Sequence, residues 1–429
     1  MNTPLLFKYR LQLLRSEHYS REQLQQLQFK RLKDIVSYAY QYVPYYSKLS
    51  KQHHLKPEDI SRLSDIRKIP VLTKEMVREH FNELISTEFR KLKPVEIRTS
   101  GSTGSPLILY HDKHMNAMIF NIFWRMWNWL GYSIGNRWAY LGFVRDKNSS
   151  ELSVYSRMER ALRFDSFSMD QKTSKKILQQ MADFKPRMLR GYPSALYEFS
   201  KYIRNEELLL RCLKLKFIMT NSEILHGFQR DHIENVFGCN VYDCFSQWEQ
   251  VGVIGECKHK KLHHHMEHGF IELLDQDSNP VHPGELGEIV GTTLINKVMP
   301  LIRYKTKDFA VKSKERCACQ REHDVYEHID GRAEDMILTP DGRRVGMFSS
   351  VFSRCNGIDT VQIIQEEQNS IHVHIVKNTD YSENEEKNVI RILKERLGQD
   401  MNVILSFTDR IKPDKSGKIR LSVCKIKSS

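Results

Sequence analysis

One short segment constrains this chain more than any other: residues 99–106 read Thr-Ser-Gly-Ser-Thr-Gly-Ser-Pro. Glycine lets the backbone turn its N–H groups toward an anion, and each hydroxyl adds a donor that rotates to suit the same anion. Residues 95–98 alternate like a strand, and residues 107–110 resume one. We therefore predict a turn between two strands that binds phosphate oxygens through Thr99, Ser100, Gly101, Ser102, Thr103 and Gly104.

The same residues are also typical of an ordinary solvent-exposed turn rich in serine and glycine, and that alternative stays open for the segment taken alone. A Walker loop is excluded, because the segment lacks the Gly-Lys-Ser/Thr ending and stands between two strands instead of between a strand and a helix.

Downstream of this loop, short apolar segments alternate with amphipathic ones, which predicts an α/β sheet. The segment 115–130 repeats apolar residues at the spacing of a buried helix face, and it is too short and too polar to cross a membrane. The predicted buried strands are residues 138–144, 188–191 and 215–219, and the predicted helices between them are residues 174–183 and 194–205.

From Phe270 the pattern changes to strands linked by turns, at residues 270–274, 287–291 and 301–304, which indicates a β-barrel-like subdomain at about 270–330. A compact section follows, with predicted strands at 361–365 and 371–376 and an amphipathic helix at 384–397. We place a domain boundary near Asp330. The sequence thus predicts an α/β protein of multi-domain α+β type, with a large N-terminal domain (1–330) and a small C-terminal domain (331–429).

The 429 residues carry a net charge of +13, which suits phosphorylated ligands, nucleic acid or an anionic membrane surface. Because the charges are dispersed and no nucleic-acid-binding motif accompanies them, we expect no specific nucleic acid partner. Weak association with an anionic membrane stays open. Eight unevenly placed cysteines and a polar N-terminal segment without a signal-peptide core predict a cytoplasmic protein that is not transmembrane. The oligomeric state stays open.

Four further motifs follow the hydroxyl-rich loop, and all five stand in the order found in the adenylate-forming superfamily. The four are Phe-Ser-Gln-Trp-Glu at 245–249, Arg-Tyr-Lys-Thr-Lys-Asp at 303–308, Gly-Arg-Ala-Glu-Asp at 331–335 and Ser-Gly-Lys-Ile-Arg at 416–420. Within that superfamily the chain resembles the phenylacetate–CoA ligase-like branch, especially the CapK-type proteins associated with capsule and surface polysaccharide synthesis. Residues 42–46 and 69–74 match the N-terminal pattern of this branch, and the resemblance runs from about Ile35 to Lys427.

This resemblance implies an enzyme that activates a carboxylic acid with ATP as an acyl-AMP, releases pyrophosphate, and transfers the acyl group to CoA, with an aromatic or related acid as substrate. The CapK likeness implies an alternative acceptor, an amine or hydroxyl on a sugar, a lipid or a carrier. A third alternative is a non-catalytic nucleotide- or polyanion-binding protein on the same fold. The retained Glu249, Asp308, Arg332 and Lys418 argue against that third alternative.

The resemblance also assigns residue roles. Lys418 would be the catalytic lysine that bridges the carboxylate and the α-phosphate. Glu249 would bind Mg²⁺, because this hard cation prefers carboxylate oxygens as ligands. A hinge at Glu334 and Asp335 would carry a mobile C-terminal lid. The resemblance further implies that Ser100–Gly104 bind the β- and γ-phosphates and that Ser222, Glu223 and Phe245 contact adenine. Asp308 would bind the ribose hydroxyls, and Arg332 would contact ribose and phosphate.

Two positions depart from the pattern: Trp248 replaces a phosphate-contacting threonine, and Ser105 stands where many relatives have lysine. A second candidate site contains Cys257, His263, Cys317 and Cys319. The branch often carries a cysteine after its magnesium-site helix, which we expect here after Glu249, and then Leu-His and Cys-x-Cys. Sulfur and imidazole ligands suit tetrahedral Zn²⁺, and two cysteines one residue apart can act from one tight turn. The alternative is a buried thiol with three incidental neighbours.

Overall fold

The chain divides into two compact units, which are described separately. The first unit contains Met1–Ile134 and Tyr242–Ile329, and the second contains Gly135–Val241 and Asp330–Ser429. The computed structural model describes residues 3–99, 107–142, 144, 152–166, 169–332, 336–342, 344–345, 348, 352, 355, 357–412 and 419–426. The last segment of the second unit begins at Asp330, next to the predicted start of the C-terminal domain at residue 331. The mobile lid and its hinge stay predictions.

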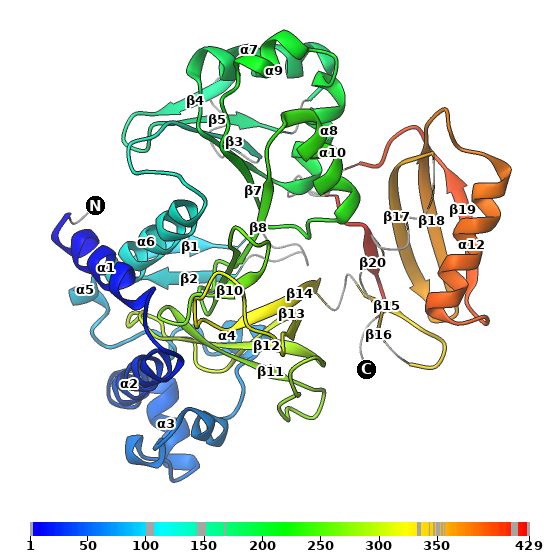
Figure 1. Ribbon diagram of the computed structural model, residues 1–429. Helices are drawn as coiled ribbons and strands as arrows, with labels where there is room; N and C mark the ends of the chain where they lie inside the picture. The colour runs from blue at the N-terminus through cyan, green and yellow to red at the C-terminus, as the bar shows by residue number, and fades with distance from the viewer. Residues whose placement is uncertain are drawn as a thin grey trace. The chain divides into compact units, whose positions relative to one another are not determined.

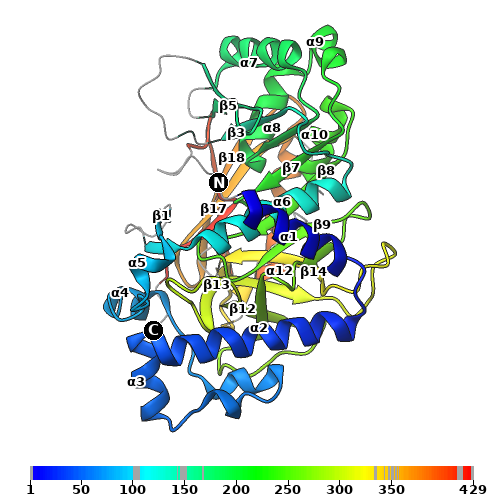
Figure 2. The ribbon, with the colours of Figure 1, turned by 90° about the vertical axis from the view of Figure 1, so that its left-hand side faces the viewer.

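Three helices begin the first unit: α1 (Thr3–Ser16), α2 (Arg21–Tyr42) and α3 (Pro44–Gln52). The Ser20 hydroxyl accepts a hydrogen bond from Gln23 N, and the Gln23 side chain accepts one from Ser20 N, so α2 starts with a capping box. Figure 2 shows α2 as the long dark blue helix. From Leu32 onward its buried residues enter a core with strand β13 (Tyr304–Lys312) and the segments that follow α3.

Short elements lead from α3 to a hairpin and the long helix α6. They are the 3-10 turns Pro57–Asp59 and Leu63–Lys68, α4 (Lys74–Glu79), α5 (Phe89–Leu92), β1 (Val95–Arg98), β2 (Ile108–His111) and α6 (Lys113–Trp129). The predicted strand pair around the hydroxyl-rich loop is confirmed as an antiparallel hairpin. The predicted core helix is confirmed as α6, which buries Met115, Met118, Ile122 and Met126.

The first unit is organised around a largely antiparallel sheet with the strand order β11-β12-β13-β14-β10-β9-β8. Among the described residues this sheet is open at β11, so the predicted barrel-like subdomain is wrong as a closed barrel. The strand expected at 301–304 begins only at Tyr304, because Arg303 has a left-handed φ of 52°. The strands are β8 (Val241–Ser246), β9 (Val253–Glu256), β10 (Leu262–His264), β11 (Gly269–Leu274), β12 (Leu286–Thr293), β13 (Tyr304–Lys312) and β14 (Val325–Arg332).

The second unit contains the predicted α/β sheet, in the order β7-β6-β3-β5-β4, and its helices α7 and α8 lie where the sequence predicts them. The strands pair in parallel except at the β5–β4 edge. The elements are β3 (Trp138–Gly142), β4 (Ser153–Ser156), β5 (Ala161–Asp165), α7 (Gln171–Phe184), β6 (Met188–Gly191), α8 (Pro193–Ile203), α9 (Glu207–Cys212), β7 (Phe217–Asn221) and α10 (Gly227–Phe237).

A four-stranded sheet, in the order β19-β18-β17-β20, forms the C-terminal part of the second unit, with α12 along one face (Figure 1). Val389, Leu393 and Leu397 of α12 share a buried core with Val373 and Ile375 of β18. The predicted strand–strand–helix section is thereby confirmed. Its elements are β15 (Ile337–Leu338), β16 (Arg344–Val345), β17 (Ile358–Glu367), β18 (Ser370–Lys377), α12 (Glu383–Leu397), β19 (Asn402–Phe407) and β20 (Ser422–Cys424).

A search of the described helices for one that is long and apolar enough to cross a membrane finds none.

Candidate functional site

The base of the hydroxyl-rich loop is closed by Thr99. Its N–H donates to the carbonyl of Leu107 at 3.0 Å, and its hydroxyl oxygen accepts from Leu107 N at 2.8 Å. These two bonds complete the β1–β2 hairpin and give Thr99 a structural role at the mouth of the turn. Ser100, Gly101, Ser102, Thr103 and Gly104 lie outside the described residues, so their phosphate contacts stay predictions.

The hairpin is fixed to a neighbouring loop by Asp112 and Asn296. Asp112 caps α6 by accepting from Met115 N at 2.8 Å, and its second oxygen accepts from Lys297 N at 2.9 Å. Asn296 accepts from Asp112 N at 3.1 Å and donates to the carbonyl of Tyr110 at 2.8 Å. Both side chains are buried, so the strand that leads out of the loop has a fixed position within the first unit.

Glu249 lies in a tight turn after β8. Gln250 N donates to the carbonyl of Gln247 at 3.2 Å, and Gln250 has a left-handed φ of 52°. The turn leads directly into β9, so the magnesium-site helix expected here is absent from the described residues around Glu249. A left-handed residue ends any helical run at once, which is the physical reason that a helix does not form.

The carboxylate of Glu249 accepts a hydrogen bond from the phenol of Tyr304 at 3.1 Å. The neighbouring carbonyl of Trp248 accepts from Nε2 of His111 at 3.0 Å. Burial lowers the pKa of His111, so this imidazole is neutral and carries its proton on Nε2. Two buried side chains therefore hold the Glu249 turn, whereas the Trp248 ring, which replaces the relatives' threonine, is 49% exposed.

Tyr304 is itself held at the start of β13. Leu72 N donates to the carbonyl of Arg303 and Lys305 N donates to the carbonyl of Leu72, both at 2.9 Å, so the backbone on each side of Tyr304 is fixed. Arg303 is buried and forms a bidentate pair with Glu272, at 2.9 and 3.1 Å. The β-bridge between Leu72 and Tyr304 thus orients Tyr304, which contacts Glu249.

Asp308 lies in an irregular part of β13. The pairing of β12 with β13 shifts register between Glu288 and Val290, and Lys307 has a left-handed φ of 65°. Lys307 N donates to the Glu288 carboxylate at 3.1 Å, and Asp308 N donates to the Thr306 hydroxyl at 3.1 Å. Such irregularities redirect a side chain out of a strand's regular alternation, and they are common beside active sites.

Phe245 pairs with Ile254 across β8 and β9, and its half-buried ring packs against a cluster that includes Leu262 and Ile289. Phe245, Glu249 and Asp308 thus all lie on the first unit, at strand ends or at an irregularity.

Ser222 and Glu223 follow β7 in the second unit. Ser222 is exposed and has a left-handed φ of 70°. The carboxylate of Glu223 accepts from the backbone N–H and from the hydroxyl of Ser194, each at 3.0 Å, in the first turn of α8. A carboxylate is stabilising at a helix N-terminus. Glu223 therefore has a structural role through its side chain, and its predicted adenine contact would come from the backbone.

Arg332 is the last residue of β14. The remaining predicted positions, the hinge residues Glu334 and Asp335 and the catalytic candidate Lys418, lie outside the described residues. Their roles stay predictions.

Cys257, His263, Cys317 and Cys319 are brought together in the first unit, with one potential ligand atom from each within 4.8 Å of all the others. Sγ of Cys257 is 3.5 Å from Sγ of Cys317, and Sγ of Cys319 is 3.4 Å from Nε2 of His263. In a tetrahedron with Zn–S bonds of about 2.3 Å, two sulfurs are about 3.8 Å apart. The donor types and spacings therefore fit one zinc ion.

Two tight turns present the three cysteines, and strand β10 presents His263. Cys257 follows β9, where Cys257 N donates to the carbonyl of Lys261 at 3.0 Å, and Cys317 and Cys319 lie in a turn where Gln320 N donates to the carbonyl of Cys317 at 3.1 Å. Cys317 and Cys319 thus lie in one turn, and their binding of a metal stays a prediction. Hydrogen bonds from Cys257 and His263 lower the pKa of the Cys319 thiol well below its usual range, so the cluster favours a thiolate.

A buried ion pair that the sequence patterns did not reveal lies beside this cluster. Arg125 of α6 forms a bidentate pair with Glu267, at 2.6 and 3.0 Å, and both side chains are essentially inaccessible to solvent. Burial alone would raise the pKa of Glu267, but the charge of Arg125 lowers it, so the carboxylate is ionised. Ser16 and His323 also contact it. The only sequence signal for the Arg125–Glu267 pair was the presence of Arg125 in the predicted core helix α6.

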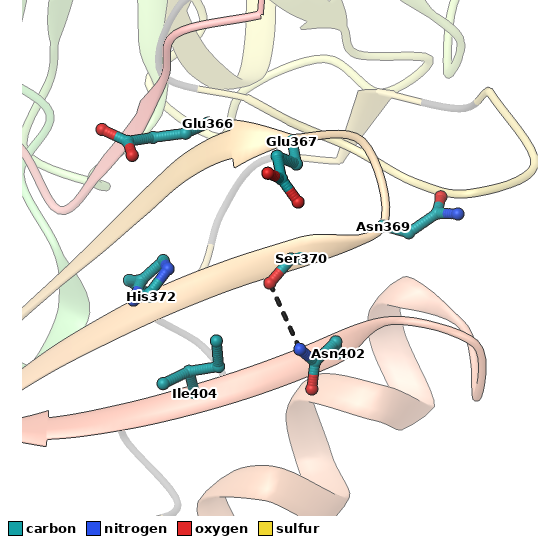
Figure 3. Close-up of a pocket in the computed structure, with 7 residues that line it drawn as sticks. All are labelled: Glu366, Glu367, Asn369, Ser370, His372, Asn402 and Ile404. Atoms are coloured by element: carbon teal, nitrogen blue, oxygen red, sulfur yellow. Dashed lines mark hydrogen bonds between the residues drawn. The ribbon is translucent and has the colours of Figure 1, made fainter.

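A shallow hollow on the C-terminal sheet of the second unit contains none of the predicted site residues (Figure 3). Asn402 of β19 donates to the hydroxyl of Ser370 of β18 at 3.4 Å across it. The lining residues are Glu366, Glu367, Asn369, Ser370, His372, Asn402 and Ile404.

Residues 337–425 match the family described as the CapK C-terminal domain. Over 94% of its length, the chain is 24% identical to CapK from Staphylococcus aureus and covers 89% of that protein. It is 26% identical to the phenylacetate-coenzyme A ligases of Thermus thermophilus and Escherichia coli, over 75% and 78% of this chain and 73% and 76% of those proteins.

Solved structures show the same fold. A 2-hydroxyisobutyryl-CoA ligase in the postadenylation state, in complex with an acyl-AMP, superimposes with a TM-score of 0.79 at 18% identity, over 96% of this chain and 91% of that one. An anthranilate CoA ligase in complex with anthranoyl-AMP gives a TM-score of 0.56 at 15% identity, over 85% of this chain and 75% of that one. The chain is therefore a homologue of CapK and of the phenylacetate-coenzyme A ligases, with the α/β fold of an adenylate-forming CoA ligase.

Proposed function

We propose that this protein is an adenylate-forming acid–CoA ligase. It uses ATP to activate a carboxylic acid, aromatic or related, as an acyl-AMP, and then forms an acyl-CoA thioester. The observation that carries the proposal is that the chain is similar to phenylacetate-coenzyme A ligases over three quarters of its length and retains the nucleotide motifs in order. We also propose a cytoplasmic location, because ATP and CoA are cytoplasmic substrates and the eight unevenly placed cysteines do not suit a secreted disulfide framework.

In the first step, an oxygen of the substrate carboxylate attacks the α-phosphorus of ATP, the bond to the bridging oxygen breaks, and pyrophosphate leaves. Two anions must approach each other, so positioning and charge neutralisation supply most of the acceleration. Lys418 would bridge the carboxylate and the α-phosphate, and Ser100–Gly104 would bind the β- and γ-phosphates. Asp308 would accept hydrogen bonds from the ribose hydroxyls, and Arg332 would contact ribose and phosphate.

Glu249 suits a magnesium ligand, because it offers a hard carboxylate oxygen on a turn whose backbone and side chain are both held. When bound, Mg²⁺ neutralises charge on the phosphates. Tyr304 keeps the carboxylate in place, and His111 holds the Trp248 carbonyl of the same turn. Phe245 would lie against the adenine ring.

In the second step, the thiolate of CoA attacks the acyl carbon, the bond to the phosphate oxygen breaks, and AMP leaves. We propose that residues 331–429 act as a lid that turns about Glu334 and Asp335 between the two steps, so that Lys418 serves only the first. Hinges of this kind absorb backbone rotation in a few residues.

A second acceptor is favoured by a specific observation: residues 337–425 match the CapK C-terminal domain, and similarity to CapK extends over almost the whole chain. In this alternative, the acyl or aminoacyl group passes from the adenylate to an amine or hydroxyl on a sugar, a lipid or a carrier during capsule or surface polysaccharide synthesis. The first half-reaction is the same in both cases.

We propose that Cys257, His263, Cys317 and Cys319 bind one structural Zn²⁺. Four protein ligands fill a tetrahedron and leave no position for water, so this ion would have no catalytic role. It would join the segment that follows the Glu249 turn to the segment that follows the Asp308 strand. Metal binding to a site that is absent from the unfolded chain contributes directly to folding free energy.

The acceptor is identified by incubating the protein with ATP, Mg²⁺ and single members of a panel of aromatic, aliphatic and amino acids, with and without CoA. We expect rapid AMP release and a thioester product only when CoA is present. Adenylate formation that is unaffected by CoA, together with transfer to an added amine or hydroxyl acceptor, would instead support the CapK-type alternative.

A further inference from the structure

The outward face of α1 carries a stripe of large apolar side chains. Phe7, Leu11 and Leu14 are 61%, 39% and 37% exposed. Their spacings of four and three residues place them in one row along the helix. Scattered exposed apolar residues are ordinary, but three in one row on a helix face have the arrangement that a partner-binding surface requires.

Cations border this stripe on both sides. Helical spacing places Lys8 and Arg15, both exposed, along one side and Arg10 along the other. The guanidinium of Arg10 lies 4.1 Å from the centre of the Trp124 ring of α6. Thr3–Ser16 contains no aspartate or glutamate. The outward face of α1 thus combines an apolar centre with positively charged edges.

The helix is a fixed part of the first unit. Its opposite face buries Leu5, Tyr9 and Leu13 in a core shared with α6, and Figure 2 shows α1 lying across α6. Asn121 of α6 donates to the carbonyl of Leu6 at 3.1 Å. The outward face is therefore presented in a preformed helical conformation, and no folding is needed for it to meet a surface.

We propose that α1 docks this protein on an anionic membrane surface. Phe7, Leu11 and Leu14 would enter the boundary between headgroups and acyl chains, and Lys8, Arg10 and Arg15 would lie against anionic headgroups. Helices with an apolar stripe between cations bind in the interface plane in this way, and each cation near an anionic surface adds to the attraction. A second copy of this chain fits less well, because a twofold contact would bring the cations of two identical helices together.

The test is flotation of the full chain with vesicles of phosphatidylcholine, with or without phosphatidylglycerol. We expect flotation with the anionic vesicles, little with neutral ones, and a decrease at high salt. Phe7→Ser combined with Leu11→Ser should weaken partitioning roughly tenfold or more, because two apolar side chains no longer enter the lipid. The matched control is Leu208→Ser on α9, which removes an 80% exposed leucine elsewhere and should float like the wild type.

Lys8→Glu combined with Arg15→Glu is a second variant that leaves the apolar stripe intact. It should lose binding to anionic vesicles while its thermal midpoint stays within a degree or so of the wild type, since exposed charges contribute little to stability. Failure of the wild type to float, equal flotation of the Phe7/Leu11 variant, or a concentration-dependent dimer abolished by that variant would each overturn the proposal. Pyrophosphate exchange measured in solution should be unchanged in both variants. The experiment therefore tests membrane docking separately from the proposed enzyme activity.

Discussion

The phenol of Tyr304 donates a 3.1 Å hydrogen bond to Oε1 of Glu249, and this bond joins the start of β13 to the turn after β8. The two residues belong to different sequence motifs, at 303–308 and 245–249. Tyr304 is almost completely buried, and the backbone on both sides of it is bonded to Leu72. The proposed magnesium ligand is therefore oriented by a rigid neighbour, which makes Tyr304 a positioning residue.

Tyr304→Phe removes this hydrogen bond and keeps the ring. We expect the Mg²⁺ concentration for half-maximal activity to rise roughly tenfold, since a hydrogen bond to a charged group contributes about 1.5–3 kcal/mol. The measurement is a magnesium titration of acid-dependent pyrophosphate exchange. Tyr46→Phe is the control, because its phenol bonds to the backbone of Pro300 and Ile302 and does not touch Glu249. An unchanged magnesium requirement in Tyr304→Phe would contradict the positioning role.

Asp308→Ala should raise the KM for ATP with a much smaller effect on the KM for the acid, because the ribose hydroxyls lose a charged acceptor worth about 1.5–3 kcal/mol. Steady-state kinetics with each substrate varied in turn measures the difference. The Asp308 backbone lies in an irregular strand segment, so thermal unfolding of the variant checks that the fold is intact. A stable variant with an unchanged KM for ATP would remove the ribose-binding role.

Lys418→Ala and Glu334→Pro should separate the two half-reactions. Without its ammonium group, position 418 no longer bridges two anions, so adenylate formation should fall while conversion of a preformed acyl-AMP is retained. Proline at 334 restricts the backbone, so adenylation should be retained and thioester formation should fall. Single-turnover assays of each half-reaction are the measurement. Equal losses in both half-reactions for both variants would contradict the hinge.

Metal analysis of protein purified without an affinity tag should give close to one zinc per chain. Cys317→Ser should lower both the zinc content and the thermal midpoint, because one of the four ligands is lost. Cys244→Ser is the matched control, since Cys244 is a buried thiol of the same unit outside the cluster. A metal-free protein whose stability does not change in Cys317→Ser would contradict the proposed zinc site.

Local patterns predicted much of the fold. The apolar spacing in residues 115–130 predicted α6, and the alternation around the hydroxyl-rich loop predicted β1 and β2. The barrel and the helix after Glu249 were wrong. Closure of a sheet depends on which distant strands pair, and a left-handed residue such as Gln250 has no clear signature outside glycine and asparagine.

The grouping of Cys257, His263, Cys317 and Cys319 was predicted because the branch that the chain resembles often carries a cysteine, a Leu-His and a Cys-x-Cys in this order. The Tyr304–Glu249 bond was not, because it joins residues 55 positions apart, and tyrosine in a strand is most often a packing residue. Glu223 illustrates the opposite case: a residue assigned to the nucleotide has its carboxylate bonded to the first turn of α8. Motif order thus supplied the candidate residues, but not the hydrogen bonds that their side chains make.

Exchange of labelled pyrophosphate into ATP, measured across a panel of carboxylic acids with wild-type protein and Lys418→Ala, tests the central claim most directly. Reversible acyl-AMP formation requires exchange that depends on both an acid and Mg²⁺, because the label enters ATP only by reversal of the adenylation step. We predict such exchange with at least one acid and its near loss in Lys418→Ala. Binding of ATP without exchange for any acid tested would contradict the enzyme assignment and support a non-catalytic nucleotide-binding protein.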